Sequence, residues 1–197
     1  MPGKEGDHPA EVRRIQILKI LLAACNAKYI HSNLAVYSLK ANAGKYEEDI
    51  ELAEYTINHQ KEEILAGIYR KKPDVVGFSC YIWNIEYVRQ LVRNLKNLCP
   101  NVKIWVGGPE VSYDCESFLR SLPQVDGILY GEGEKSFPAL IEYYTARERD
   151  VKCENDSKSE CDAKSEKRDM QDALDQTKKM NPSSEMLPNG TAWLDEN

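Results

Sequence analysis

The side chains most suited to catalysis or ligand binding lie in a loop that follows the first apolar run of the chain. Residues 25–33 are Cys-Asn-Ala-Lys-Tyr-Ile-His-Ser-Asn. His31 carries an imidazole, which can move a proton or bind a metal near neutral pH. No Cys, His, Asp or Glu stands beside it at the spacing of a zinc site, so we predict no metal site. The simpler interpretation of His31 is a hydrogen-bonded surface residue, and Ser32 or Asn33 can cap a following helix.

Two glycine-rich loops follow later apolar runs. Gly107-Gly108 would let a bulky group approach the backbone closely, although a turn from strand to loop is the simpler explanation of the pair alone. Residues 131–134, Gly-Glu-Gly-Glu, differ from a phosphate loop because Glu134 separates Gly133 from Lys135. Two carboxylates would also repel a phosphate. They favour the positive end of a helix dipole, so this loop is either a helix start or a contact for a ligand or domain.

The composition excludes several classes of protein. The chain has 197 residues, with 26 Lys and Arg against 32 Asp and Glu, and this acidic balance argues against a nucleic-acid-binding module. The longest apolar run, residues 15–25, is too short to span a membrane. It resembles a lipoprotein signal, but Lys19 interrupts it. The six cysteines include no C-x-x-C pair and indicate reduced thiols. We therefore predict a cytoplasmic protein that binds neither nucleic acid nor membrane.

The elements that must position these loops alternate along the chain. Apolar runs predict strands, and apolar residues at helical spacing predict the helices between them. The predicted strands are 15–24, 49–58, 75–79, 102–106 and 127–130, and the predicted helices are 33–44, 61–71, 84–98, 114–121 and 131–144. In the first helix, Leu34, Tyr37 and Ala41 are expected to form the apolar face, with Val36 and Leu39 pointing elsewhere.

This alternation predicts an α/β fold, a flavodoxin-like (Rossmann-like) five-stranded parallel sheet with helices on both faces. The second strand is less apolar, which favours the order 2-1-3-4-5 with the first strand central. Ligands of such sheets bind at the carboxyl ends of the strands. The loops at this edge are therefore expected to form the site; they are 25–33, 79–84, 107–113 and 131–136.

The two ends of the chain differ from its centre. A polar leader covers residues 1–14, and the folded domain is predicted over residues 15–146. Residues 147–197 mix Lys, Glu, Asp and Ser with few large apolar side chains, which is typical of a flexible linker or tail. Cys153 and Cys161 have no third ligand near them and are expected to be solvated thiols.

The loop sequences together resemble a known family. Asn26 to Ala35, Gly77-Phe78-Ser79, residues 106–110 (Val-Gly-Gly-Pro-Glu) and residues 131–134 are similar to the amino-terminal cobalamin-binding domain of radical S-adenosylmethionine enzymes, a group that includes anaerobic magnesium-protoporphyrin IX monomethyl ester cyclase and several methyltransferases. The resemblance covers about residues 15–146. It implies a flavodoxin-like fold and cobalamin, vitamin B12, as the cofactor.

Two departures from related patterns limit what the resemblance implies. Other cobalamin domains carry D-x-H-x-x-G, whose His is the lower cobalt ligand, whereas His31 here has neither the Asp nor the Gly. His31 is therefore not predicted to bind cobalt. The C-x-x-x-C-x-x-C motif that holds the iron–sulfur cluster of the radical domain is also absent. We expect no catalysis from this chain alone, and a partner domain, in the same longer chain or separate, would hold the cluster and S-adenosylmethionine.

The resemblance implies that the nucleotide tail of cobalamin enters near Ser79 and Gly107-Gly108 while the corrin lies over residues 26–33. The candidate cofactor-binding residues are Asn26, Ala27, Tyr29, Ile30, His31, Ser32, Asn33, Ser79, Tyr81, Gly107, Gly108, Pro109, Glu110, Gly131, Glu132 and Gly133. The alternative is a degenerate α/β interaction module that has kept the fold and lost the cofactor. A receiver or flavodoxin-type domain is not supported, because no acidic cluster or Ser/Thr-rich phosphate loop follows the first strand.

Overall fold

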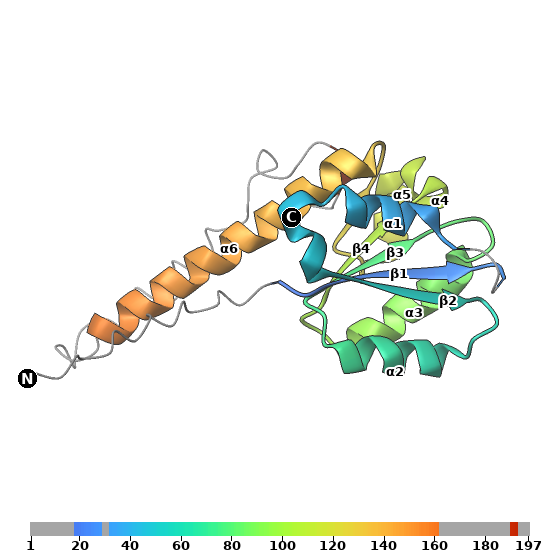
Figure 1. The fold of residues 1–197 in the computed structure, drawn as a ribbon. Helices are drawn as coiled ribbons and strands as arrows, with labels where there is room; N and C mark the ends of the chain where they lie inside the picture. The colour runs from blue at the N-terminus through green and yellow to red at the C-terminus, as the bar shows by residue number, and fades with distance from the viewer. Residues whose placement is uncertain (1–17, 29–31, 162–189, 193–197) are drawn as a thin grey trace, which may run out of the picture.

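The computed structural model describes residues 18–28, 32–161 and 190–192, with side-chain detail up to residue 147 and at 190–192. A central sheet has helices on both of its faces (Figure 1). The strands are β1 (Ile20–Asn26), β2 (Ile50–Thr56), β3 (Val75–Ser79), β4 (Lys103–Gly107), β5 (Gly127–Leu129) and β6 (Thr191–Ala192). The helices are α1 (Leu34–Ala41), α2 (Lys61–Lys71), α3 (Ile85–Leu98), α4 (Pro109–Ser112), α5 (Cys115–Ser121) and α6 (Gly133–Cys161), with a 3₁₀ helix at Gly44–Asp49.

The sheet has the order β2-β1-β3-β4-β5-β6. Strands β1 to β5 are parallel, which confirms the predicted fold class and the order 2-1-3-4-5. The predicted number of strands was wrong, because the sheet has six. The sixth, β6, pairs antiparallel to β5 and comes from the region predicted as a charged tail. The rest of that tail prediction falls largely outside the described residues.

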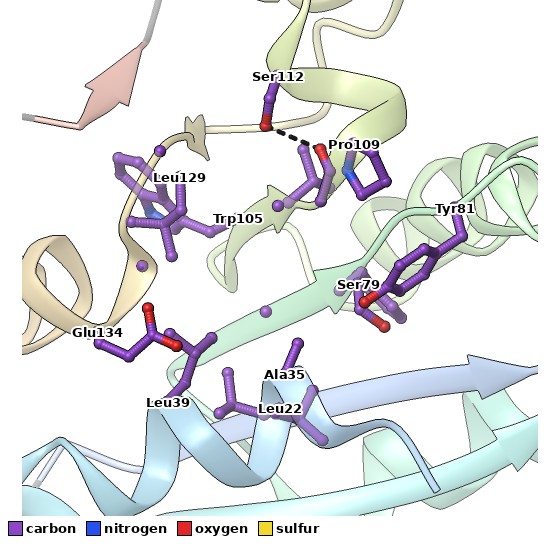
Figure 2. Close-up of a pocket in the computed structure, with 18 residues that line it drawn as sticks. Leu22, Ala35, Leu39, Ser79, Tyr81, Trp105, Pro109, Ser112, Leu129 and Glu134 are labelled. Atoms are coloured by element: carbon purple, nitrogen blue, oxygen red, sulfur yellow. Dashed lines mark hydrogen bonds between the residues drawn. The ribbon is translucent and has the colours of Figure 1, made fainter. Parts of the chain in front are cut away.

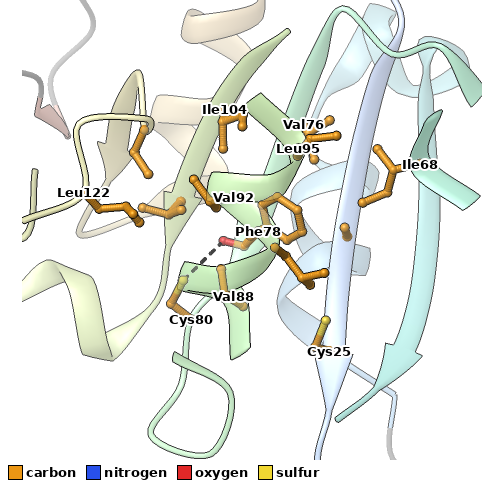
Figure 3. Close-up of a cluster of buried hydrophobic side chains, with 14 of the residues drawn as sticks. Cys25, Ile68, Val76, Phe78, Cys80, Val88, Val92, Leu95, Ile104 and Leu122 are labelled. Atoms are coloured by element: carbon orange, nitrogen blue, oxygen red, sulfur yellow. Dashed lines mark hydrogen bonds between the residues drawn. The ribbon is translucent and has the colours of Figure 1, made fainter. Parts of the chain in front are cut away.

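The core consists of two apolar layers, one on each face of the sheet. Along β1, Leu21 and Ala23 face one layer while Leu22 and Ala24 face the other, as the alternation of a strand requires. The first layer packs α2, α3 and α5 against the sheet (Figure 3). The second packs α1 and the beginning of α6 against it. Continuous burial of β1 follows from this arrangement, since both of its faces are covered.

Helix α1 presents a different face to the sheet from the predicted one. Val36 is buried, whereas Leu34 is 79% exposed and Tyr37 is 45% exposed. The prediction placed Leu34 and Tyr37 inside because, together with Ala41, they lie on one helical face. Val36 and Ala43 instead fill the layer beside β1, with Leu39 partly buried against it. The two exposed side chains are thereby left near the carboxyl edge of the sheet.

Helix α6 continues to Cys161, well past its predicted end at about residue 144. No Gly or Pro follows Pro138 until Pro182, so nothing in the sequence ends the helix at residue 144. The first turns of α6 are the part that packs on the sheet, through Phe137, Leu140 and Ile141. In the part of the chain that the structure describes, no helix has both the length and the apolar character needed to cross a membrane.

Candidate functional site

A cavity of about 410 Å³ opens at the carboxyl ends of β3, β4 and β5. Its walls are mostly apolar: Leu22, Val36 and Leu39 lie on one side, and Trp105, Val106 and Leu129 contribute from the neighbouring strands. Figure 2 shows side chains of β1, α1, β3, β4 and the beginning of α6 turned toward this space. A volume of this size is typical of small-molecule sites. The cavity lies at the edge where ligands of parallel α/β sheets bind.

Glycines create the room in this cavity. A Cβ on Gly77 would lie 2.8 Å from Cδ2 of Leu22, and a Cβ on Gly133 would lie 2.9 Å from Cδ2 of Leu39. Gly108 has a φ of 118°, and a Cβ there would lie 2.4 Å from the carbonyl oxygen of Cys80. The backbone N–H of Cys80 also donates to the carbonyl of Gly107 at 2.7 Å. Gly77 and Gly133 therefore leave room for the side chains of the wall, and Gly108 lets the loops after β3 and β4 come into direct backbone contact.

Polar groups on the cavity wall are few. The Ser79 hydroxyl accepts a 2.8 Å hydrogen bond from Nδ2 of Asn33, and the Ser112 hydroxyl donates to the carbonyl of Gly108 at 2.8 Å. Glu134 accepts a 2.8 Å hydrogen bond from the Ser38 hydroxyl of α1. Its own backbone N–H and Ser38 hold the pKa of the Glu134 carboxyl below its usual value. The wall thus offers hydroxyl groups and one carboxylate at separate points of an apolar surface.

The loop after β1 is anchored by Glu54 of β2. The Glu54 carboxylate accepts hydrogen bonds from Nδ2 of Asn26 at 3.0 Å, from the backbone N–H of Asn33 at 2.9 Å and from the Tyr37 hydroxyl at 2.7 Å. Desolvation raises the pKa of this carboxyl, but the three donated bonds outweigh it, and the net pKa is lowered. Glu54 therefore fixes both ends of the loop while it is ionised.

Asn33 connects this loop to the cavity. Its side-chain oxygen accepts from the N–H of Ala35, which makes Asn33, one of the two predicted candidates, the N-cap of α1. Its side-chain amide at the same time donates to Ser79 at the end of β3. The start of α1 is therefore held beside β3, and this places Ala35 and Val36 on the cavity wall.

Asn84 connects the ends of two central strands. Its buried side-chain amide donates to the carbonyls of Cys25 and Ser79, both at 3.0 Å. Its side-chain oxygen accepts from the N–H of Tyr81 at 2.8 Å. The turn after β3 is thereby fixed, and in this turn the Tyr81 and Trp83 rings stack with their centroids 4.5 Å apart. Tyr81 lines the cavity, so Asn84 positions one of its walls.

Large apolar side chains stand exposed on the segments around this edge. They follow the strands or begin the next helix, and they are Leu34, Ile82, Trp83, Tyr113 and Tyr130. Tyr113 is 99% exposed and Ile82 is 76% exposed. Side chains of this kind are available to pack against a ligand or another domain.

The structure brings only part of the predicted site together around the cavity. The predicted residues that line it are Ser79, Tyr81, Gly107, Gly108, Pro109, Gly131 and Gly133. Asn26 and Asn33 do not line it but hold the loops that do. Ala27, Ser32, Glu110 and Glu132 are not among the lining residues. Tyr29, Ile30 and His31 lie outside the described residues.

Several residues that build the site escaped the sequence-based prediction. Trp105 and Leu39 line the cavity, while Glu54 and Asn84 organise its loops. Gly77 was a usable signal, because a glycine inside a buried strand indicates a close approach. The described residues contain no group of three or more His, Cys, Asp or Glu arranged to hold a metal ion.

Comparison with known proteins shows the family of the chain. A model of the B12 binding domain matches residues 20–141. The cobalamin-dependent radical SAM methyltransferase TokK of Streptomyces tokunonensis is 36% identical over 80 residues, which cover 41% of this chain and 12% of that protein. An uncharacterized methyltransferase, PH0819 of Pyrococcus horikoshii, is 27% identical over 103 residues, 52% of this chain and 22% of that protein.

The fold also has relatives among solved structures. The cobalamin-dependent S-adenosylmethionine radical enzyme OxsB, with aqua-cobalamin and S-adenosylmethionine bound, superposes with a TM-score of 0.56 at 18% identity. The match covers 66% of this chain and 19% of OxsB. Each of these relatives is thus several times longer than the part that this chain matches. Because the family model spans more than half of its length, the chain belongs to the B12-binding domain family.

Proposed function

We propose that the chain binds cobalamin at the carboxyl edge of its sheet, with the nucleotide tail in the cavity and the corrin over residues 26–33. The observation that carries the proposal is the apolar cavity, in which Gly77 and Gly133 leave room beside Leu22 and Leu39, in a chain of this family. The tail of cobalamin ends in a flat apolar base, which suits a slot with walls of Leu, Val and Trp side chains. The cofactor-binding role that the sequence analysis gave to its candidate residues is part of this proposal.

The described residues fit the cofactor in two further respects. The missing side chain of Gly108 lets the loops after β3 and β4 meet backbone to backbone, and Gly107 and Gly108 of this contact line the cavity. The hydroxyls of Ser79 and Ser112 and the carboxylate of Glu134 are the polar groups at hand for the sugar of the tail. When bound, cobalamin supplies a cobalt centre for methyl or electron transfer, and the protein contributes binding and orientation.

We further propose that the bound corrin faces a radical S-adenosylmethionine catalytic domain, in the same longer chain or separate. The lengths of TokK and PH0819 relative to the matched segments support this. The exposed Ile82, Trp83 and Tyr113 at the edge give such a domain an apolar surface to pack against. Catalysis would then need the partner, because the chain has no C-x-x-x-C-x-x-C motif. A cytoplasmic location is part of the same proposal.

A direct test is the equilibration of the purified chain with hydroxocobalamin, followed by desalting and a visible spectrum. We expect the corrin absorbance to stay with the protein and the fluorescence of Trp105, which lines the cavity, to be quenched. A colourless protein under both oxidising and reducing conditions would favour the alternative, an interaction module without cofactor.

A matched pair of variants tests the place of binding. Ala35 and Ala41 are exposed residues of the same helix, α1, but only Ala35 lines the cavity. Ala35→Phe should occupy the mouth and weaken hydroxocobalamin binding by at least about tenfold, since a clash that costs 1.4 kcal/mol has this effect. Ala41→Phe should bind as the unaltered chain does. Equal binding of hydroxocobalamin by both variants would show that the nucleotide tail does not bind in this cavity.

A further inference from the structure

The last described residues of the chain contact the loop that closes the cavity. In β6, Thr191 pairs with Leu129 and Ala192 pairs with Ile128 of β5. The carbonyl of Gly190 accepts a 2.8 Å hydrogen bond from the backbone N–H of Tyr130. Tyr130 is the residue directly before the loop 131–134. The pairing therefore continues up to the residue that precedes this loop.

Gly190 also packs against the other end of that loop. It has a φ of 90°, and a Cβ there would lie 3.1 Å both from Cβ of Ser136 and from the carbonyl oxygen of Tyr130. The hydroxyl and the N–H of Ser136 both donate to the carbonyl of Glu132, at 3.3 Å. The Gly190 backbone thus lies between Tyr130, directly before the loop, and Ser136 in the first turn of α6, after it.

The loop held in this way forms one wall of the cavity through Gly131, Gly133 and Glu134. Strand β5 has three residues, and its only other strand neighbour among the described residues is β4, which pairs through the same three positions. So short a strand gives little support at a free edge of the sheet. Pairing with β6 gives a second strand partner to Ile128 and Leu129, close to the point where the loop begins.

We propose that Gly190–Ala192 is a positioning strand of the cofactor site, which holds the loop 131–134 in its binding conformation. The inference rests on the proposed function, and it goes beyond the matched domain because these residues lie outside positions 20–141. According to this inference, the affinity for the cofactor depends on a segment that follows α6. The sequence predicts only a linker in this part of the chain.

Proline substitution tests the proposal in the full chain. In an antiparallel pair, every second residue of a strand directs its N–H toward the partner strand. Gly190 is paired with Tyr130 in this way, so Ala192, two residues later, directs its N–H toward β5. Ala192→Pro removes this donor. We expect the Kd for hydroxocobalamin to rise about tenfold, which is about 1.4 kcal/mol at 25 °C. We also expect faster amide hydrogen exchange at Tyr130, Gly131 and Gly133 in the cofactor-free protein.

Lys61→Pro is the control, since position 61 is the first residue of α2, on the opposite face of the sheet. Gln60 before it is already extended, with φ −70° and ψ 139°, as a residue before proline must be. The control should keep both the affinity and the exchange rates. A second variant, Gly190→Val, disturbs the same contact through its side chain and should act like Ala192→Pro.

The outcomes separate the inference from the proposed function. Unchanged exchange at residues 130–133 in both strand variants would overturn the inference, whatever the affinity for cobalamin. Equal cobalamin affinity of Ala192→Pro and the unaltered chain would overturn it as well. Absence of binding by the unaltered chain, together with faster exchange in the variants, would instead contradict the proposed function and leave the strand with its role in holding the loop.

Discussion

Replacement of Asn84 should destabilise the fold more than any other single polar change at the carboxyl edge. The side chain is 1% exposed and makes three hydrogen bonds, two donated to carbonyls and one accepted from the Tyr81 N–H. Asn84→Ala removes all three and leaves buried backbone groups without these partners. A buried group left unsatisfied costs about 1–3 kcal/mol. Because relaxation and water recover part of this, we expect a total loss of roughly 2–4 kcal/mol.

Chemical and thermal unfolding measure this loss. For a domain of this size, 3 kcal/mol corresponds to a decrease in Tm of roughly 9–15 °C. Asn101→Ala is the matched control, since Asn101 lies exposed in the turn before β4 and should change the stability by less than about 0.5 kcal/mol. A loss below about 1 kcal/mol for Asn84→Ala, with an unchanged m-value, would refute the view that this amide ties β1 to β3.

Two further predictions concern the loops of the site. The pKa of Glu54 is lowered in the folded state, so its contribution to stability is present above the unfolded-state pKa and disappears as the pH falls through the folded-state pKa. In Glu54→Gln, the free energy of unfolding should therefore fall less steeply as the pH is lowered through the acid range. The same pH dependence as in the unaltered chain would contradict the role of Glu54. Gly108→Ala forces a positive φ on a side chain and brings its Cβ against the carbonyl of Cys80. It should cost roughly 2–4 kcal/mol in denaturant unfolding, and a neutral result would show that the loop can move aside.

The order of the sheet could be predicted from the sequence because few physical rules determine it. Five apolar runs separated by amphipathic helices leave right-handed parallel crossovers as the solution. The less apolar sequence of β2 identified it as the weaker strand near the edge, and only three of its seven residues are buried. The bounds of α2 and β3 agree with the prediction to the residue. In these elements, local periodicity and tertiary packing require the same residues to be buried.

Strand β6 could not be predicted in this way. Two residues, Thr191 and Ala192, are too few to show alternation, and the charged residues before them indicate a linker. Their pairing depends on the free edge of β5, which is a property of the assembled sheet. The roles of Glu54 and Asn84 were missed for a similar reason, since each joins segments far apart in the sequence: Glu54 and Asn33 are 21 residues apart, and Asn84 and Cys25 are 59 residues apart.

The error on α1 has a more specific cause. The prediction turned the face with Leu34 and Tyr37 inward because these residues stand at helical spacing, but both side chains are exposed. Tyr37 gains a hydrogen bond to Glu54 in this position, and that bond helps to hold the loop after β1. Natural sequences depart from simple patterning mainly where a site imposes its own demands. The exposed Leu34, together with Ile82 and Trp83, therefore supports the proposal that this edge of the sheet meets a ligand or a partner domain rather than water alone.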